Sequence, residues 1–274
     1  MRCEVIAEVG WNHLGDMDLA RRMIQAAAES GADVVKFQTW HADRLTSGPW
    51  DTDGRREIYR AAELRPEHYP ILMDACREHG VRFLTSVFAA ADVPFVAELG
   101  LQEIKIPSQE AYSGDLLRAV DGRFDRVLVS TGASEWDEVL RVPTLIQRSA
   151  LTLLHCVSAY PCDAGRVNLP RLQALKKVTP SVGYSGHLQA VDDAVAAIAL
   201  GVDYVEKHFT IDRSLPGRDN QFALLPEQFR QICRFRDTWM EMSIDHGLQL
   251  QDCELDVKDR YRGRWAAGEG STAG

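Results

Sequence analysis

Residues 30–38 read Ser-Gly-Ala-Asp-Val-Val-Lys-Phe-Gln, and this stretch contains the pattern that decides the fold. A glycine follows an amphipathic segment, a β-branched apolar run comes next, and the polar side chains of Lys36 and Gln38 close the run. Glycine suits the left-handed conformation that ends many helices, and a short β-branched run is typical of a buried parallel strand. The stretch therefore predicts a helix end joined to a parallel strand.

The same junction recurs along the chain, at His79-Gly80-Val81, Leu99-Gly100-Leu101 and Leu200-Gly201-Val202. Together with the apolar runs elsewhere, it predicts strands at Cys3–Val9, Asp33–Gln38, Val81–Ser86, Leu101–Ile106, Arg126–Ser130, Leu151–Val157, Ser181–Tyr184 and Asp203–Phe209. Amphipathic segments between them predict helices at Met17–Ser30, Pro66–His79, Ala91–Leu99, Ser113–Val120, Ser134–Gln147, Leu169–Lys177, Gln189–Leu200 and Pro226–Ile244. Eight such units in 274 residues favour an α/β fold of the (β/α)8 TIM-barrel type, with an open doubly wound sheet as the alternative.

Two segments depart from this repeat. The polar insertion Trp40–Leu64 is predicted to be a lid or substrate loop, and the side chains that could stack on a ligand or supply a cation there are Trp50, Tyr59, Arg44, Arg55 and Arg56. After Leu248 the chain becomes polar. We therefore expect a barrel domain over residues 1–248 and a polar extension or linker over residues 249–274.

Composition limits the classes of function. The chain is 45% hydrophobic, which is enough for a large core, and it has no apolar run long enough to suggest a membrane span. Its 31 basic and 40 acidic residues give a net charge of −9, which disfavours unspecific binding to nucleic acid or anionic lipid. The six cysteines form no CxxC pair, and no basic-then-apolar leader opens the chain. These features predict a cytoplasmic protein with reduced thiols that acts on small molecules.

Polar residues at the carboxyl ends of the strands are the candidates for chemistry in such a barrel. Lys36 and Lys105 each lie in an otherwise apolar strand, where a single lysine is costly to bury and could simply form an ion pair. Two lysines near several strand-end hydroxyls favour a cage for a phosphate or carboxylate. The hydroxyls are those of Ser86, Ser108, Ser130 and Ser185.

His187 and His208 close neighbouring strands of the predicted barrel. Two imidazoles at adjacent strand ends can converge on one metal ion and leave coordination positions open, as a catalytic ion requires. Glu8 and Glu110 are possible outer partners. A hydrogen-bonded structural role for each histidine is the alternative.

The strand-end motifs also follow one another in a familiar order. They are Ile6-Ala7-Glu8-Val9-Gly10-Trp11-Asn12-His13, Val35-Lys36-Phe37-Gln38-Thr39, Lys105-Ile106-Pro107-Ser108-Gln109-Glu110, Ser130-Thr131-Gly132, Leu154-His155-Cys156-Val157-Ser158-Ala159-Tyr160-Pro161, Gly183-Tyr184-Ser185-Gly186-His187 and Glu206-Lys207-His208-Phe209-Thr210. Over residues 3–262 the chain resembles the sialic acid synthase family, which comprises N-acetylneuraminate synthases and their legionaminic and pseudaminic acid relatives.

The resemblance implies a barrel enzyme that condenses phosphoenolpyruvate with the aldehyde of an N-acetylated amino sugar and releases phosphate. It implies a divalent ion, Mn²⁺ or Mg²⁺, on His187 and His208, and proton transfer and alignment by Glu8 and Glu110. Phosphoenolpyruvate would be held by Lys36, Ser86, Lys105, Ser108, Ser130, Ser158 and Ser185. The sugar hydroxyls would meet Gln38, Tyr160 and Asp219.

Several departures from the family pattern bear on the substrate. Gly186 stands where the family usually has aspartate, Gln109 stands where it has glycine, and Arg218-Asp219-Asn220 replaces Pro-Asp-His. The resemblance further implies a small antifreeze-like domain that would begin after Trp265, and the sequence ends nine residues later. We expect a different closure of the site, and the homodimer that the resemblance implies is left open.

Three functions are compatible with these residues. The first is the phosphoenolpyruvate-dependent synthase, the second a metal-dependent barrel enzyme with lyase or epimerase chemistry, and the third a non-catalytic sugar- or anion-binding accessory protein. Because buried cations are costly without a ligand or counter-ion, retention of both lysines and both histidines favours an active site.

Overall fold

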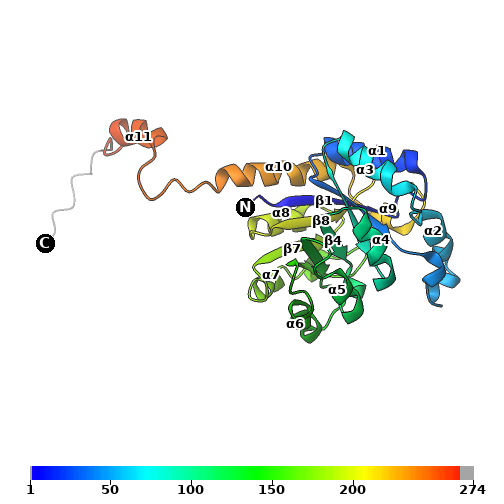
Figure 1. The fold of residues 1–274 in the computed structure, drawn as a ribbon. Coiled ribbons are helices and arrows are strands. Elements are labelled where there is room, and N and C mark those ends of the chain that lie inside the picture. Colours follow the sequence, from blue (N-terminus) through cyan, green and yellow to red (C-terminus); the bar gives the residue numbers. More distant parts are fainter. Residues whose placement is uncertain (1, 266–274) are drawn as a thin grey trace. The chain divides into compact units, whose positions relative to one another are not determined.

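A computed structural model describes residues 2–265 and shows a closed barrel of parallel strands with helices outside it (Figure 1). The strands pair in chain order and β8 closes on β1, as the sequence predicted. Their bounds are β1 (Glu4–Gly10), β2 (Val34–Thr39), β3 (Arg82–Val87), β4 (Glu103–Ile106), β5 (Arg126–Ser130), β6 (Ala150–Cys156), β7 (Ser181–Gly186) and β8 (Tyr204–His208). The closed order excludes the open doubly wound sheet.

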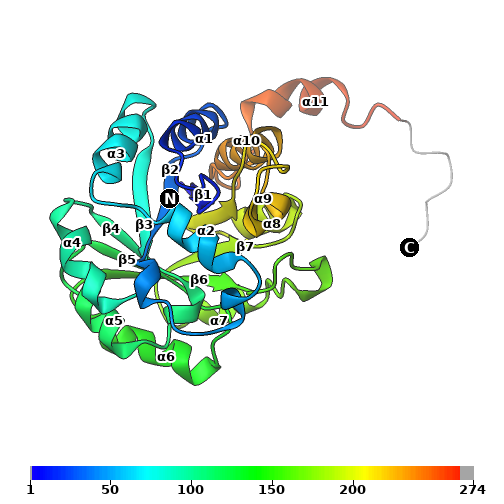
Figure 2. The same ribbon diagram turned by 90° about the vertical axis from the view of Figure 1, so that its right-hand side faces the viewer.

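The outer helices occupy the predicted segments and surround the barrel (Figure 2). They are α1 (Met17–Glu29), α3 (His68–Glu78), α4 (Val93–Glu98), α5 (Gly114–Val120), α6 (Trp136–Leu145), α7 (Arg171–Leu175), α8 (Asp192–Ala199) and α10 (Pro226–Met242). The first begins at Asp16, whose side chain accepts hydrogen bonds from the backbone N–H groups of Asp18 and Leu19. The glycines of the four recurring junctions have positive φ angles, as predicted; they are Gly31, Gly80, Gly100 and Gly201.

The core has two apolar layers. A large layer lies between the barrel and the helices, and a small one fills the barrel interior with Ile6, Val34, Leu84, Leu128, Leu154 and Tyr204. Side chains alternate along a strand, so the residues two positions further on also point inward. Those residues are Glu8, Lys36, Ser86, Ser130, Cys156 and Glu206. A polar layer therefore lies directly on an apolar floor.

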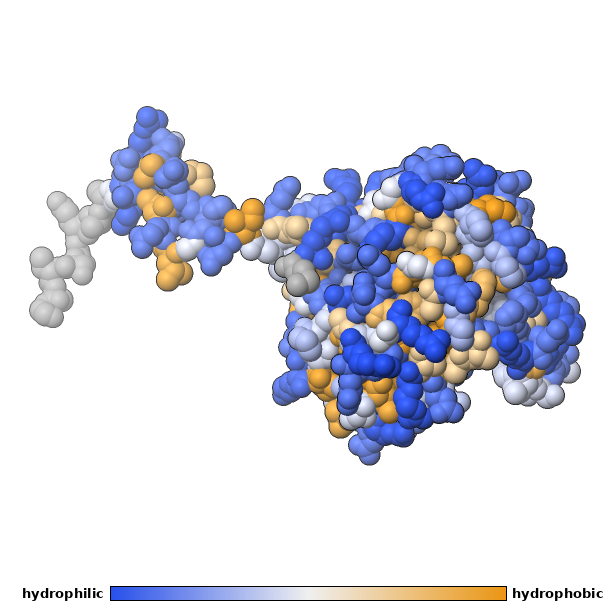
Figure 3. Space-filling model, in the orientation of Figure 1, coloured by the Kyte–Doolittle hydropathy of each residue, from blue (hydrophilic) through white to orange (hydrophobic). Residues whose placement is uncertain are grey.

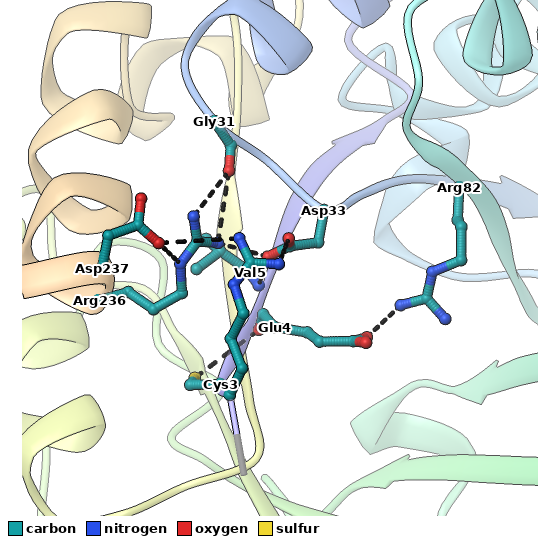
Figure 4. Close-up of polar contacts among 9 residues, drawn as sticks. Cys3, Glu4, Val5, Gly31, Asp33, Arg82, Arg236 and Asp237 are labelled. Atoms are coloured by element: carbon teal, nitrogen blue, oxygen red, sulfur yellow. Dashed lines mark hydrogen bonds and ion pairs between the residues drawn. The ribbon is translucent and has the colours of Figure 1, made fainter. Parts of the chain in front are cut away.

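Ion pairs close the opposite, amino-terminal end of the barrel (Figure 4). Arg236 of α10 is buried and donates to the Asp33 carboxylate, to Asp237 at 2.8 Å and to the Gly31 carbonyl at 3.4 Å. The same Asp33 carboxylate accepts from the backbone N–H of Val5 at 2.8 Å. This cluster fixes α10 to the starts of β1 and β2.

The insertion Trp40–Leu64 is more ordered than the predicted loop. It contains the short 3₁₀ turns η1 (Ala42–Arg44) and η2 (Pro49–Asp51) and the helix α2 (Arg55–Ala62), which lies across the carboxyl-terminal mouth of the barrel (Figure 2). The helix was not predicted from the polar composition, because its stability depends on tertiary packing. Its packing partners form an apolar cluster of Trp11, Trp40, Ile58, Tyr59, Ala62 and Phe88.

The chain divides into two compact units, Met1–Trp239 and Met240–Gly274. The described part of the second unit contains η6 (Asp252–Glu254) and α11 (Leu255–Arg260). The predicted domain boundary after residue 248 stays a prediction. Over residues 2–265 no helix combines the length and apolarity that crossing a bilayer requires. The barrel face seen in Figure 3 is largely hydrophilic with small apolar patches.

We expect Arg236→Met to lower the free energy of unfolding by about 2 kcal/mol, because it leaves the half-buried Asp33 carboxylate with fewer donors. Arg230→Met on the same helix is the matched control, since Arg230 forms only a surface pair with Glu227. Denaturant unfolding measures both. Equal stability of the two variants would contradict a structural role for the Arg236 cluster.

Candidate active site

A cavity of about 360 Å³ opens at the carboxyl-terminal end of the barrel, and every strand contributes to its wall. The predicted site residues that line it are Glu8, Lys36, Gln38, Ser86, Lys105, Ser108, Ser130, Ser158, Tyr160, Ser185, His187, His208 and Asp219. Glu110 is the exception. The structure therefore brings nearly the whole predicted site together, and we call this space the main cavity.

The two lysines are buried at the floor of the main cavity and each contacts a carboxylate. Lys36 Nζ lies 2.7 Å from Glu8 Oε2 and 2.9 Å from Ser86 Oγ. Lys105 Nζ lies 3.0 Å from both carboxylate oxygens of Glu206. Both interpretations of these lysines thus apply, because they form buried ion pairs and also face the cavity.

The two carboxyl groups differ in their affinity for a proton. Burial raises the pKa of Glu8, although Lys36 opposes the shift. Burial also acts on Glu206, but Lys105 and Lys36 outweigh it and lower the pKa of Glu206 to about 2. Glu8 is therefore the carboxyl at the cavity floor that takes up a proton more readily. Glu206 was not among the predicted site residues. It lies two residues before His208 and therefore on the same face of the strand, which is the sequence pattern that could have identified it.

Hydroxyl groups complete the floor. Ser130 Oγ is buried and has no hydrogen-bond partner within residues 2–265. Ser185 Oγ donates to Glu206 at 3.1 Å, and Ser108 Oγ accepts from the Gly132 N–H at 3.1 Å. A buried unpartnered hydroxyl is costly unless a ligand satisfies it. This arrangement fits the predicted anion cage.

Gly10 makes room for a contact between two predicted site residues. Gln38 Nε2 donates to Glu8 Oε1 at 2.6 Å. Gly10 has a φ of 55°, and a Cβ there would lie 3.0 Å from Gln38 Nε2 and 3.1 Å from Glu8 Oε1. Glycine both tolerates this backbone conformation and leaves the space for the Gln38–Glu8 hydrogen bond.

The rings of His187 and His208 lie 5.5 Å apart between centroids and both line the main cavity. His187 Nδ1 is 2.8 Å from the Val157 carbonyl, which leaves its other ring nitrogen free for a ligand. Within residues 2–265, His208 Nδ1 is buried without a hydrogen-bond partner, and it lies 3.7 Å from Asp219 Oδ2. The Tyr160 ring packs on both histidines.

These donors fit a metal ion with open coordination positions. A histidine that binds a metal usually donates its second ring N–H to a carbonyl or carboxylate, and the His187–Val157 contact has this form. Over the described residues, no group of three or more histidine, cysteine, aspartate or glutamate side chains has the geometry of a metal cluster. These donors therefore fit an ion that two imidazoles hold and whose coordination water or substrate completes.

Glu110 lies apart from the other predicted residues. It ends the turn η4 (Ser108–Glu110) after β4 and lines a neighbouring chamber rather than the main cavity. Its carboxylate is half-buried, and burial raises its pKa. Because β4 ends before Ser108, the turn carries Glu110 out of the strand-end ring. This position was not evident from the strand pattern.

The cavity wall also contains residues that the sequence analysis did not select. Burial alone would raise the pKa of the Cys156 thiol, but His187 lowers it to about 7. Arg218, on the short helix α9 (Arg218–Phe222), donates to the Tyr160 carbonyl at 3.1 Å. Within residues 2–265 its guanidinium has no carboxylate partner, so Arg218 supplies positive charge at the mouth.

Only part of the insertion faces the main cavity. Arg55 and Tyr59 line it, so α2 forms part of the wall. Arg56 instead donates to Asp51 and to the Leu45 and Thr46 carbonyls, and Arg44 pairs with Asp92. The expectation that all three arginines of the insertion offer a cation to the ligand is therefore wrong for Arg56, whose donors stabilise the insertion itself.

Comparison with known proteins decides the family. The model that describes the NeuB family matches residues 23–244. The chain belongs to the NeuB family.

Several of its relatives are named acid synthases. The chain is 32% identical over 246 residues to the N,N'-diacetyllegionaminic acid synthase of Campylobacter jejuni, covering 84% of this chain and 74% of that protein. It is 33% identical over 251 residues to the enzyme of the same name from Legionella pneumophila, covering 85% and 70%. The crystal structure of the sialic acid synthetase of Leptospira borgpetersenii, solved with citrate, superposes with a TM-score of 0.83 at 26% identity and 96% and 93% coverage. This NeuB protein is an enzyme of the sialic acid synthase type.

The structure explains the Gly186 departure from the NeuB pattern. Asp193, at the start of α8, fills the space beside Gly186, where an added Cβ would lie 2.4 Å from Asp193 Oδ2. Lys207 Nζ contacts both Asp193 carboxylate oxygens, at 2.8 and 2.9 Å, and donates to the Leu188 carbonyl at 2.7 Å. Tyr184 donates to the same carboxylate at 2.8 Å. Gly186 lies opposite Lys207 in the β7–β8 register, so a side chain at position 186 would project beside Lys207. The Asp193 carboxylate occupies that space instead.

We expect Asp193→Ala to lower the free energy of unfolding by about 3 kcal/mol, because it leaves the Lys207 ammonium buried without a counter-ion. Adding Gly186→Asp to this variant supplies a carboxylate opposite Lys207 and should restore part of the loss, because its Cβ would still lie 2.5 Å from the Tyr184 ring, which must shift. Gly186→Asp alone should destabilise, since it meets Asp193.

A double-mutant cycle of thermal or denaturant unfolding measures the coupling, with the exposed Asp192→Ala as the matched control. Additive losses in the double variant would show that the two positions are not interchangeable.

Proposed function

We propose that this NeuB protein condenses phosphoenolpyruvate with the open-chain aldehyde of an N-acylated amino sugar of the N-acetylmannosamine type. The products are a 2-keto sugar acid and inorganic phosphate. The observation that carries the proposal is the pair of buried lysines, Lys36 and Lys105, among hydroxyls at the floor of a cavity whose mouth holds His187 and His208. Membership of the NeuB family agrees with it.

The charge at the cavity floor limits how the anion binds. Lys36 and Lys105 are matched by Glu8 and Glu206, so the four side chains together carry no net charge when all are ionised. A trianionic ligand therefore needs further positive charge or the loss of one negative charge. A proton on Glu8 would release Lys36 for the ligand, and the raised pKa of Glu8 supports this route.

The reaction makes one carbon–carbon bond and breaks one carbon–oxygen bond. The enol π electrons of phosphoenolpyruvate attack the aldehyde carbon, and the aldehyde oxygen gains a proton. Water then adds to the carbon that bears phosphate and gives one proton back to the base. The carbon–oxygen bond to phosphate breaks as the ketone forms, and the second water proton leaves with the phosphate. We assign the proton movements to Glu8, which Gln38 and Lys36 hold in place.

We further propose that His187 and His208 hold a divalent ion, Mn²⁺ or Mg²⁺. Such an ion, when bound, polarises a carbonyl oxygen and lowers the pKa of bound water. The support is the unpartnered, buried Nδ1 of His208 and the His187–Val157 contact, which holds the His187 ring in one orientation.

The acceptor would enter from the mouth of the main cavity. Gln38, Tyr160 and Asp219 line it there, and we propose that they bind the sugar hydroxyls. Arg218 adds a donor beside Tyr160. We also propose that the enzyme works in the cytoplasm, which agrees with the free thiols of its cysteines, five of them buried. A homodimer stays a prediction.

We expect Lys36→Met and Lys105→Met each to weaken phosphoenolpyruvate binding about 30-fold or more, since loss of a charged donor to a buried anion costs about 2 kcal/mol. Isothermal titration calorimetry measures the affinity, and the exposed Lys177→Met is the matched control. Unchanged affinity in both buried-lysine variants would refute the anion cage.

We expect His208→Ala to abolish Mn²⁺-dependent phosphate release from phosphoenolpyruvate and N-acetylmannosamine while the melting temperature stays nearly unchanged. The reason is that His208 has no hydrogen bond to lose at Nδ1 and lies at the cavity, outside the core. Direct Mn²⁺ titration should show weakened binding, and the exposed His79→Ala is the control. Full turnover after chelation of metal from the wild type would overturn the metal assignment.

A further inference from the structure

A second chamber of about 510 Å³ adjoins the main cavity on the side of β2, β3 and β4. Tyr59, Phe88 and Gln109 line both spaces, so the chamber begins where the main cavity ends. Its volume lies in the range that holds small-molecule ligands, roughly 300–1,000 Å³. Of its lining residues, the resemblance to the family assigns a role only to Glu110.

Five tryptophan, tyrosine and phenylalanine side chains line the chamber. The rings of Trp40 and Tyr59 meet edge to face at 5.5 Å between centroids, and those of Trp40 and Phe88 at 5.8 Å. The indole N–H of Trp40 donates to the Tyr59 carbonyl at 3.1 Å, so this wall has no indole donor to offer. Trp50 and Tyr112 line the same chamber. Such a wall binds the apolar face of a ring.

The charges of the chamber differ from those of the main cavity. Arg44 pairs with the buried carboxylate of Asp92, and His41 Nε2 lies 3.3 Å from the same carboxylate. Glu110 has no hydrogen-bond or ion-pair partner within residues 2–265 and lines the chamber. Arg44, the guanidinium that lines the chamber, is therefore committed to a carboxylate, while an acceptor oxygen is available. This favours a neutral group that donates a hydrogen bond and disfavours a phosphate.

We propose that the second chamber binds the part of the acceptor remote from its aldehyde, and that this part is a neutral, ring-sized group with an apolar face and a hydrogen-bond donor for Glu110. The inference rests on the proposed function, which places the aldehyde in the main cavity. The group is a second sugar ring or a hydroxyaryl ring on the N-acyl substituent, and both offer an apolar face and a hydroxyl donor. The insertion Trp40–Leu64 then acts as a specificity element, because it supplies Trp40, Arg44, Trp50 and Tyr59.

The test compares phosphate release for four acceptors: N-acetylmannosamine, N-(p-hydroxyphenylacetyl)mannosamine, a disaccharide with N-acetylmannosamine at its reducing end, and N-acetylmannosamine 6-phosphate. We expect one of the two ring-extended acceptors to have a KM about tenfold lower than N-acetylmannosamine, and which one it is identifies the ring. The 6-phosphate should gain nothing from the chamber.

Variants locate the effect. Trp50→Ala should erase the preference for the ring-extended acceptor and leave phosphoenolpyruvate affinity unchanged. Tyr112→Ala should reduce it, and because Tyr112 is 63% exposed this variant keeps the fold. Trp136→Ala, on the outer helix α6, is the matched control and should keep the preference. A preference that survives both chamber variants, or equal KM values for plain and extended acceptors, would overturn the proposal.

A failure of the proposed function gives a different result. If no acceptor releases phosphate, calorimetric titration of the wild type with N-(p-hydroxyphenylacetyl)mannosamine and with the disaccharide still tests the chamber. Binding that Tyr112→Ala weakens and Trp136→Ala does not would support the chamber and refute only the condensation. Absence of binding to either compound would refute the chamber itself.

Discussion

Four ionised side chains buried inside the barrel form the constraint on which the rest of the structure depends. Glu8, Lys36, Lys105 and Glu206 come from four different strands and meet above a floor of apolar side chains. An isolated buried charge costs several kcal/mol, so each is tolerated only because closure of the barrel brings its partner. A shift of any of these strands by one residue would turn its charge outward and leave the partner unpaired.

The charges of these four side chains also limit how the site can bind a ligand. The four side chains of this network together carry no net charge when ionised and therefore attract an anion only weakly. A proton on a carboxylate or a bound divalent ion would make the net charge positive and create an anion site. Glu8 and the histidine pair His187 and His208 stand at the two places where such a change can occur. The apolar floor below excludes water from the network, which strengthens each interaction within it.

The departures from the NeuB pattern have local physical explanations. The carboxylate beside Lys207 comes from α8 rather than from β7, and Gly186 leaves it the space. Arg218 gives the mouth a guanidinium without a carboxylate partner among the described residues, and the insertion builds an aromatic chamber next to the main cavity. Around the strand-end residues, the wall of the site is therefore completed by α8, α9 and the insertion.

The sequence by itself determined the barrel, its eight strands and most of the strand-end polar residues that line the main cavity, because these positions follow from a period of two and from repeated glycine junctions, whereas Asp219 came from the resemblance to the family. Only the tertiary structure decided that Glu206 joins the lysines, that Glu110 turns into a second chamber and that residues 55–62 form a helix. Those outcomes depend on contacts between segments far apart in the chain. The pairing of Asp193 with Lys207 is the clearest example, since the strand pattern contains no trace of a carboxylate that approaches from a neighbouring helix.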